Sequence, residues 1–359
     1  MLNFTVGPVM SEEGIRAIAS EQIPYFRTPE FSAVMLENEK LICEFMGAPA
    51  LSRAVFLTGS GTSAMEAAIS GALDRSDRVL VVSGGSFGER FCEILAFYGI
   101  EHTPIFCDAG KTLKAEQLAP FEGKGYTAFV VNLGETSTGI LYDLPLISEF
   151  CKRNGLFLIV DAISSFLCDE LDMKKYGVNV ALTGSQKALA LAPGISILCL
   201  DSEALARINR ISPKSYYLDL RKHLSNMERG QTPFTPAVSV LLQLNCRLKG
   251  IAARGGAAEE RKRTAALARY FRERIGDLPL TPFAETPSNA VTSLRLNDES
   301  KSAYTVFEVL KDEYGMFICP SGGSLKNKIF RVGHIGDLHF DDYDRLIAAL
   351  HDLVRRKLL

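Results

Sequence analysis

Short apolar runs alternate with helical segments through the first two thirds of the chain, and this feature limits the possible folds most. Some of the runs, such as AFVVNL and FLIVDA, are apolar throughout, as expected of parallel strands buried on both faces. We predict strands at 54–58, 78–85, 102–107, 128–133, 157–162, 180–185 and 195–200. Helical patterns that end near a glycine occupy 63–73, 87–99 and 144–155. The alternation predicts an α/β domain with a mostly parallel sheet.

The length and the later elements indicate a second domain. At 359 residues the chain exceeds the size at which one hydrophobic core usually stops growing. A charged helical stretch at 257–276 is followed by a strand pattern at 288–297 and a helix at 303–315, and a last helix begins near Asp341. We therefore expect an N-terminal arm at 1–14, a large α/β domain at 15–250 and a small C-terminal α+β domain at 251–359.

Charge and cysteine usage narrow the classes of partner. The net charge is −2, which gives no electrostatic reason to expect nucleic acid or an anionic membrane surface. The eight cysteines are scattered, without a CxxC pair or a cluster with histidine, which suits a reducing cytosol. No secretory signal begins the sequence, and its apolar runs are too short to span a bilayer. We expect a cytoplasmic protein that binds small molecules or proteins.

A glycine-rich turn, LTGSGTSAMEAA, joins the first strand to a helix. The backbone amides there and the hydroxyls of Ser60 and Thr62, with Gly61 between them, suit a phosphate group at the helix start. The segment also fits the dinucleotide fingerprint of Rossmann-type modules, which requires an acidic residue at the end of the next strand. That strand ends in Gly84 and Gly85 instead, so we favour a phosphate cup, with a plain turn as the alternative.

Further candidate residues follow three more strands of the predicted sheet. Phe87, in GGSFGERF, is either a core aromatic or a stacking platform for a flat ring. Thr136, in NLGETSTGIL, belongs to a hydrogen-bonded turn or contacts a ligand. Asp161, in FLIVDAISSF, either caps the next turn or faces a cationic partner. The carboxyl ends of parallel strands meet at one edge of a sheet, so these residues are expected to gather there.

Lys187 lies in VALTGSQKALALAPG, where its sequence neighbours include no acidic residue. The usual interpretation of such a lysine is a surface side chain whose ammonium reaches water. A poorly solvated lysine, however, has a lowered pKa, and its neutral amine can attack a carbonyl group. Pyridoxal phosphate combines the features that these candidates could bind. It has a phosphate, a flat ring, a ring nitrogen that needs a carboxylate, and an aldehyde that needs a lysine.

The segment IFRVGHIG near the C-terminus contributes a possible anion-binding residue. Arg331 interrupts an apolar strand there, and it is either structural or a bidentate clamp for a carboxylate. His334 and His339 have the spacing H-x4-H, but no third ligand is in view. We therefore expect no metal site.

Taken together, these motifs resemble the class V, fold type I pyridoxal-phosphate aminotransferases, from TVGP at the start to FRVGHIG near the end. TGSQKAL is similar to the lysine segment of alanine–glyoxylate and serine–pyruvate aminotransferases. The segments SGGSFGERF, GETSTGIL, VDAISSF, FTPAV and FRVGHIG are similar to those of 2-aminoethylphosphonate–pyruvate aminotransferase. The resemblance implies the fold type I architecture, with a large domain built on a mostly parallel sheet and a smaller C-terminal α+β domain.

The resemblance also implies a role for each candidate. Lys187 would bond to the cofactor and later move a proton, and Asp161 would pair with the ring nitrogen. Thr235, in QTPFTPAV, would reach the phosphate in the neighbouring subunit of a homodimer. Arg331, helped by backbone near Gly7, would hold the substrate carboxylate. The remaining cofactor-binding residues would be Ser60, Gly61 and Thr62 with Gln186 at the phosphate, Phe87 on the ring, and Thr136 near the ring hydroxyl.

We expect a ping-pong transamination in which a small amino donor gives its nitrogen to pyruvate or glyoxylate. The favoured donor is 2-aminoethylphosphonate, with alanine or serine next. One alternative is a lyase or desulfurase on the same fold, but enzymes of that kind generally place a histidine where this chain has Phe87. A Rossmann-type nucleotide-binding module is the other alternative, and it leaves Lys187 unexplained.

Overall fold

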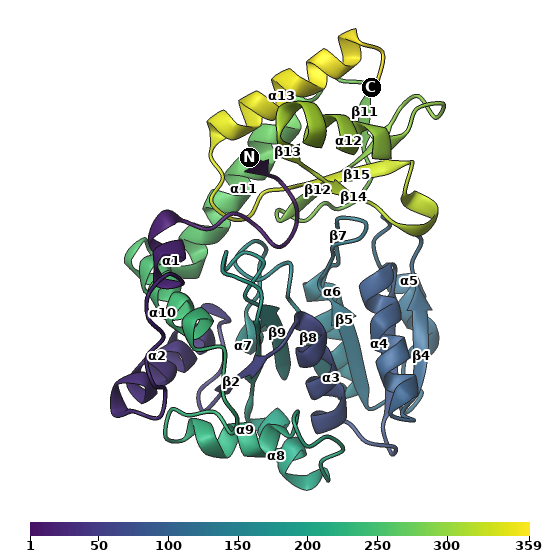
Figure 1. Ribbon diagram of the computed structural model, residues 1–359. Coiled ribbons are helices and arrows are strands. Elements are labelled where there is room, and N and C mark those ends of the chain that lie inside the picture. The colour runs from purple at the N-terminus through teal and green to yellow at the C-terminus, as the bar shows by residue number, and fades with distance from the viewer.

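A seven-stranded sheet forms the centre of the larger lobe in the computed structural model, which describes residues 1–359 (Figure 1). Its order is β2-β10-β9-β8-β5-β3-β4. The strands are β2 (Arg53–Thr58), β3 (Arg78–Ser83), β4 (Glu101–Phe106), β5 (Ala128–Asn132), β8 (Phe157–Asp161), β9 (Val180–Gly184) and β10 (Ile195–Leu200). All the predicted strands are therefore confirmed. Only β10 runs antiparallel to its neighbours, which confirms the mostly parallel sheet.

This strand order also decides between two of the predicted folds. Numbered along the chain, the sheet strands run 1-7-6-5-4-2-3 across the sheet. A Rossmann module has the order 3-2-1-4-5-6 instead. The nucleotide-binding alternative is therefore wrong.

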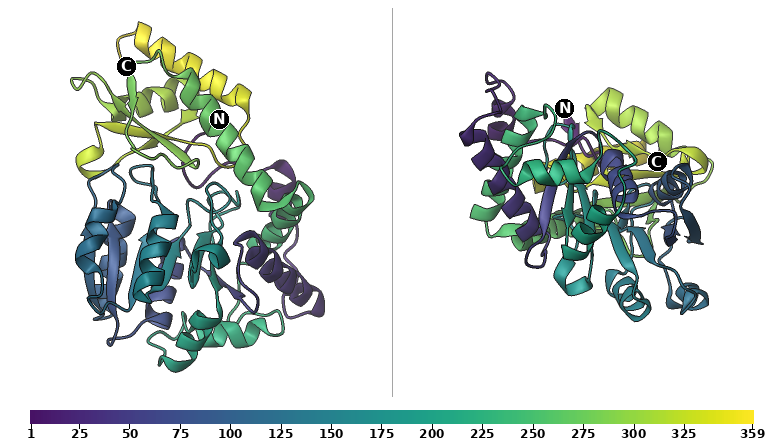
Figure 2. Two further views of the ribbon diagram at one scale, coloured as in Figure 1. Left: turned by 180° about the vertical axis from the view of Figure 1, so that it is seen from behind. Right: turned by 90° about the horizontal axis from the view of Figure 1, so that it is seen from below.

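Helices lie on both sides of the large sheet (Figure 2), because strands such as β5, β8 and β9 are buried along their whole length. The three predicted helices are confirmed as α3 (Gly61–Ala72), α4 (Ser86–Phe97) and α6 (Leu144–Asn154). α6 ends at Gly155, whose φ of 62° is left-handed and favours glycine. The other helices of this lobe are α1 (Glu13–Ile18), α2 (Pro29–Phe45), α5 (Ala115–Leu118), α7 (Met173–Tyr176), α8 (Ser202–Arg210), α9 (Leu220–Met227) and α10 (Val238–Ala253).

The smaller lobe contains a four-stranded antiparallel sheet of order β11-β12-β15-β14. Its strands are β11 (Leu280–Pro282), β12 (Val291–Leu296), β14 (Cys319–Pro320) and β15 (Ile329–Gly333). The helices of this lobe are α11 (Gly256–Arg274), α12 (Ala303–Tyr314) and α13 (Phe340–Arg355). These elements confirm the predicted strand at 288–297 and the helices predicted around it. A hairpin of β6 (Gly134–Glu135) and β7 (Ile140–Leu141) projects from the large sheet toward this lobe (Figure 1).

The hydrophobic core is divided between the two lobes. One cluster of 80 buried residues surrounds the large sheet, and another of 24 lies between the small sheet and its helices. The second cluster includes Leu2 and Phe4, because β1 (Leu2–Asn3) pairs with β13 (Met316–Phe317). We propose the boundaries 1–14, 15–250 and 251–359 for the arm and the two domains. No helix of the chain is long and apolar enough to cross a membrane.

Candidate active site

The candidate residues gather where the parallel strands of the large sheet end. Asn132 on β5 lies opposite Asp161 on β8, and Asp161 lies opposite Leu182 on β9. Lys187 follows β9 at the same edge, and α3 and α4 begin there directly after β2 and β3. Such an edge is where open α/β sheets bind ligands.

Lys187 is buried, with 9% of its surface exposed. Its Nζ donates a hydrogen bond of 2.7 Å to the carbonyl oxygen of Val6, and no carboxylate forms an ion pair with it. Burial lowers the pKa of the Lys187 ammonium, and the positive charge of Arg331 lowers it further. The surface-lysine interpretation is therefore wrong, and Lys187 is a poorly solvated amine.

Gly7 allows the arm to approach this lysine closely. A Cβ atom at Gly7 would lie only 2.8 Å from Cδ of Lys187, and the φ of Gly7 is +129°, which favours glycine. The backbone at Gly7 therefore packs directly on the stem of Lys187. The structure thus brings the predicted residues Gly7 and Lys187 together.

Asp161 ends β8 and lies inside the protein. Its Oδ1 accepts a hydrogen bond of 2.7 Å from the N–H of Ile163, which confirms that it caps the following turn, and no hydrogen bond engages Oδ2. Burial raises the pKa of Asp161 to about 7, and the charge of Glu135 adds to this effect. The charges of Lys187 and Arg90 act in the opposite direction. Asp161 is thus a buried acid with one free oxygen and no paired cation.

The start of α3 leaves several donors free. Ser60 is the N-cap residue, is exposed, and makes no capping hydrogen bond with its side chain. A Cβ atom at Gly61 would lie 2.5 Å from Cδ1 of Ile163, so the backbone of α3 packs tightly against the turn after Asp161. Gln186 is half-buried beside Lys187. The first turn of a helix offers unpaired N–H groups and a positive dipole end to an anion.

Glu135 fixes the start of α4 and with it Phe87. Its buried carboxylate accepts hydrogen bonds from the N–H groups of Phe87 (3.1 Å) and Gly88 (3.2 Å) and from Nδ2 of Asn132 (2.8 Å). Ser137 donates to it as well, through its N–H and its hydroxyl. This arrangement confirms the hydrogen-bonded turn predicted for GETSTG. Phe87 itself is half-buried and belongs to neither hydrophobic core, which favours a ring platform over a core aromatic.

Arg331 joins the two lobes from the middle of β15. Its Nη1 donates 2.7 Å to the carbonyl oxygen of Thr136, and its Nη2 donates 2.8 Å to that of Pro320. Opposite it across the sheet lie Ser293 on β12 and Cys319 on β14. Thr136 therefore meets Arg331 through its main chain.

Thr235 lies apart from this group. It is exposed in the loop between α9 and α10, and it makes no hydrogen bond with the other candidates. The nearby N–H of Ala237 donates 3.0 Å to Oγ1 of Thr58, at the end of β2. His334 is buried and bonds to Thr292 and Tyr343, and the chain has no group of three or more side chains that could hold a metal ion.

Two groups at the site were not found from the sequence. Arg90 stacks on Phe87, with 4.9 Å between its Cζ and the ring centroid, and donates 3.4 Å to Oγ1 of Thr62. Its spacing of three residues from Phe87 on a helix was a usable signal. The Val6 carbonyl had none, because a main-chain oxygen leaves no mark on the residue type.

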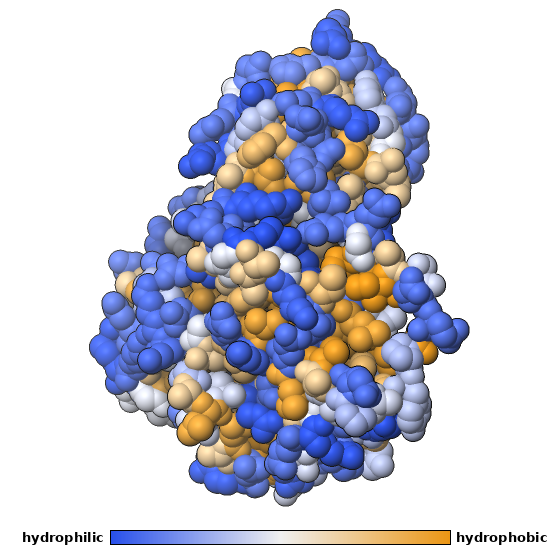
Figure 3. Space-filling view, turned by 90° about the vertical axis from the view of Figure 1, so that its left-hand side faces the viewer, coloured by the Kyte–Doolittle hydropathy of each residue, from blue (hydrophilic) through white to orange (hydrophobic).

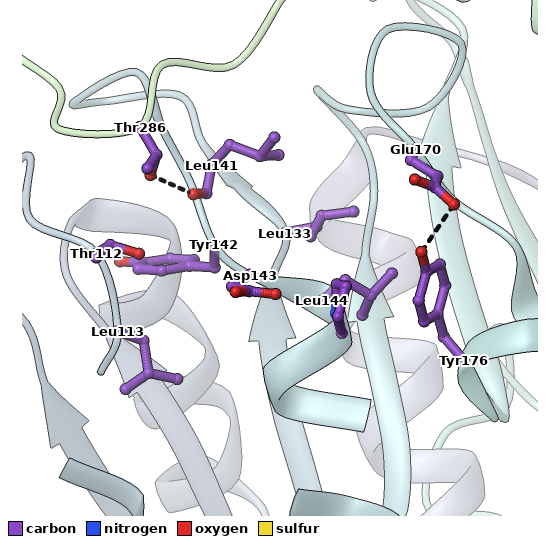
Figure 4. Close-up of a pocket in the computed structure, with 11 residues that line it drawn as sticks. Thr112, Leu113, Leu133, Leu141, Tyr142, Asp143, Leu144, Glu170, Tyr176 and Thr286 are labelled. Atoms are coloured by element: carbon purple, nitrogen blue, oxygen red, sulfur yellow. Dashed lines mark hydrogen bonds between the residues drawn. The ribbon is translucent and has the colours of Figure 1, made fainter. Parts of the chain in front are cut away.

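A separate cavity of about 400 Å³ opens beside the start of α6 (Figure 4). Tyr142, Asp143 and Leu144 line it on one side, and Glu170 and Tyr176, joined by a hydrogen bond of 2.7 Å, line it on the other. None of the predicted site residues lines this cavity. It is therefore distinct from the cluster around Lys187.

Known proteins resemble this chain over most of its length. The soluble hydrogenase 42 kDa subunit of Anabaena cylindrica is 31% identical over 96% of this chain and 90% of its own. A 2-aminoethylphosphonate–pyruvate transaminase of Bacteroides fragilis is 27% identical over 83% of each chain. The crystal structure of alanine–glyoxylate aminotransferase from Nostoc sp. matches with a TM-score of 0.92 and 26% identity, over 99% of this chain and 95% of that one.

The aminotransferase class-V family profile matches residues 25–323, a span that contains every candidate residue except Gly7 and Arg331. Members of this family use pyridoxal phosphate, and the structural neighbours have the fold type I architecture described above. The chain therefore belongs to the class-V aminotransferases, and its cofactor is pyridoxal phosphate.

Proposed function

We propose that this enzyme moves an amino group from a small donor, 2-aminoethylphosphonate first and alanine or serine next, to pyruvate or glyoxylate. The observation that carries the proposal is the state of Lys187: a buried amine with a lowered pKa, bonded to a main-chain oxygen and paired with no carboxylate. An amine in this state is a nucleophile toward a carbonyl group. The names of two similar proteins, one a 2-aminoethylphosphonate–pyruvate transaminase and one an alanine–glyoxylate aminotransferase, support the substrate classes.

The residues present fit pyridoxal phosphate. Asp161 is a buried acid with a free oxygen, and a protonated ring nitrogen is the kind of cation that would bring its raised pKa down. The start of α3 offers unpaired donors to a phosphate group. When bound, pyridoxal phosphate supplies an aldehyde carbon and a ring that accepts electrons.

Each residue then has a role that its surroundings support. Ser60, Gly61 and Thr62 bind the phosphate through main-chain N–H groups and hydroxyls, and Gln186 lies beside them. Phe87 stacks on the ring, held in place by Glu135 through its own N–H. Thr136 approaches the ring hydroxyl. Asp161 would keep the ring nitrogen protonated, and Nζ of Lys187 would take the proton from the donor carbon and deliver it to the aldehyde carbon of the cofactor.

Arg331 supports binding of an anionic group of the substrates. An arginine has five N–H donors, and the carbonyl oxygens of Thr136 and Pro320 occupy one on each Nη atom. One N–H therefore remains on each Nη atom for an anionic oxygen, in the planar arrangement that suits a carboxylate. The backbone at Gly7 packs on the stem of Lys187 and helps to enclose the space around its amine.

We further propose a cytoplasmic homodimer in which Thr235 binds the phosphate held by the partner subunit. Thr235 is exposed and makes no hydrogen bond with the other candidate residues of its own chain. Apolar residues gather over the larger lobe on the face shown in Figure 3. Exposed apolar side chains of that lobe include Ile23, Tyr25, Leu36 and Leu51, and such surfaces favour association with another protein.

Single-turnover half-reactions test the proposal. The purified enzyme is mixed separately with 2-aminoethylphosphonate, alanine, serine and cysteine, and the visible absorption of the bound cofactor is followed. We expect 2-aminoethylphosphonate to convert the cofactor fastest, and Lys187→Ala to be inactive with every donor. Lys262→Ala, which removes an exposed lysine paired with Glu259, is the control and is expected to behave as the wild type. Conversion by no donor, or sulfide release from cysteine, would reject the proposal.

A further inference from the structure

Arg90 connects two parts of the site that are separate in the sequence. It lies on α4, three residues after Phe87, and its guanidinium stacks over the Phe87 ring with 4.9 Å between Cζ and the ring centroid. The same guanidinium donates 3.4 Å to the hydroxyl oxygen of Thr62, in the first turn of α3. One side chain thus touches both the ring platform and the phosphate cup of the proposed site.

The hydrogen bond to Thr62 fixes how the threonine hydroxyl can act. An arginine side chain has donors only, so Oγ1 of Thr62 must accept this bond. A hydroxyl has a single proton, and that proton is then free for another acceptor. Arg90 therefore turns Thr62 into a donor toward whatever lies at the start of α3.

The charge of Arg90 is also without an anionic partner. No acidic side chain forms an ion pair with this half-buried guanidinium, and its hydrogen bond to Thr62 is the only one it makes. It lies close to the positive end of the α3 dipole, and two like charges there are unfavourable unless an anion joins them. A phosphate group at the start of α3 would supply that anion.

We propose that Arg90 is a positioning residue that selects the phosphorylated form of the cofactor. It orients the Thr62 hydroxyl toward the phosphate group and holds the Phe87 ring where it can stack on the cofactor ring. This inference rests on the proposed place of the cofactor. The effect of Arg90 is measured by one ratio, the dissociation constant of pyridoxal divided by that of pyridoxal phosphate.

The experiment measures both dissociation constants by titration of cofactor-free protein, followed by absorption and by fluorescence. In Arg90→Met we expect the ratio to fall roughly 5- to 30-fold through loss of one charge-assisted hydrogen bond, because the cation–π contact acts on the ring of both cofactor forms and cancels from the ratio. Arg90→Lys keeps the charge and is expected to restore the ratio to within about threefold of the wild type, while binding both forms of the cofactor less well because an ammonium does not stack as a planar group does.

A double-mutant cycle with Thr62→Val separates this role from a merely structural one. If Arg90 acts through the threonine hydroxyl, Arg90→Met combined with Thr62→Val lowers the ratio no further than the stronger single variant. Strictly additive effects, or an unchanged ratio in Arg90→Met, would overturn the inference. If Arg90→Met does not fold, Arg90→Gln takes its place in the cycle.

The wild-type protein separates this inference from the proposed function. Failure of the wild type to bind pyridoxal phosphate, with the same result for Lys187→Ala, would reject the cofactor site itself. Normal binding by the wild type together with an unchanged ratio in the Arg90 variants would reject only the role of Arg90.

Discussion

Replacement of Glu135 by glutamine is a sharp test of how the start of α4 is held. Glu135 is fully buried, and five donors face its carboxylate, three at Oε2 and two at Oε1. Four of these donors are N–H groups, which cannot act as acceptors. A glutamine at this position must turn its NH₂ group toward at least one of them, whichever way the amide lies.

The expected cost follows from these contacts. One buried N–H left without an acceptor costs about 1–3 kcal/mol, and loss of a negative charge at a helix start costs about 0.3–1 kcal/mol more. Together they predict a destabilisation of about 1.3–4 kcal/mol, or a fall in Tm of roughly 3–16 °C for a domain of this size. Removal of the Glu135 charge is also expected to lower the pKa of Asp161, because that charge raises it.

Differential scanning calorimetry of Glu135→Gln beside Glu122→Gln measures the effect. Glu122 is an exposed carboxylate that bonds to Arg153 and Asn154 on the surface, so its replacement is expected to cost less than roughly 1 kcal/mol. If Glu135→Gln melts no lower than this control, the carboxylate does not anchor α4 and the reasoning is refuted.

Three more predictions concern the same site. Gly7→Ala is expected to destabilise the protein by about 1–3 kcal/mol more than Gly123→Ala does, because both glycines have positive φ but only Gly7 presses on Lys187; equal melting temperatures would contradict this. Arg331→Lys is expected to raise KM for the 2-oxo acid roughly 10- to 100-fold with a smaller effect on kcat, which steady-state kinetics checks. The cofactor-free protein is expected to lose stability relative to Asp161→Asn as pH rises from about 4 to about 7. In this window the folded chain holds a proton on Asp161 that the unfolded chain has released. Parallel curves of Tm against pH for the two proteins would count against this prediction.

The strands and the reactive residues at their ends could be predicted from the sequence, because both depend on local residue type. The runs that became β5, β8 and β9 are apolar throughout and are buried on both faces. Asp161 ends one such run and Lys187 follows another, so the residue pattern alone indicates that each would bury a charge at a cost in free energy. The direction of β10 was not visible, because an apolar run reads the same in a parallel and an antiparallel pair.

The residues that escaped prediction owe their position to contacts between distant segments. Arg90 matters because α3 and α4 lie side by side, which brings Thr62 within hydrogen-bond distance of it. The Val6 carbonyl meets Lys187 across 181 residues of chain. Thr136 was chosen for its side chain, and the structure uses its carbonyl oxygen with Arg331. Residue type reports none of these main-chain partners.

The N-terminal arm packs into the second hydrophobic core, and this contact determines when the arm can cover Lys187 during synthesis. Leu2 and Phe4 are synthesised long before β13, the strand that pairs with β1. Until Met316 and Phe317 emerge, the arm has no strand to pair with, and the carbonyl of Val6 has no fixed place over Lys187. A nascent chain can therefore fold its large sheet early while its reactive amine stays uncovered until β13 has been made.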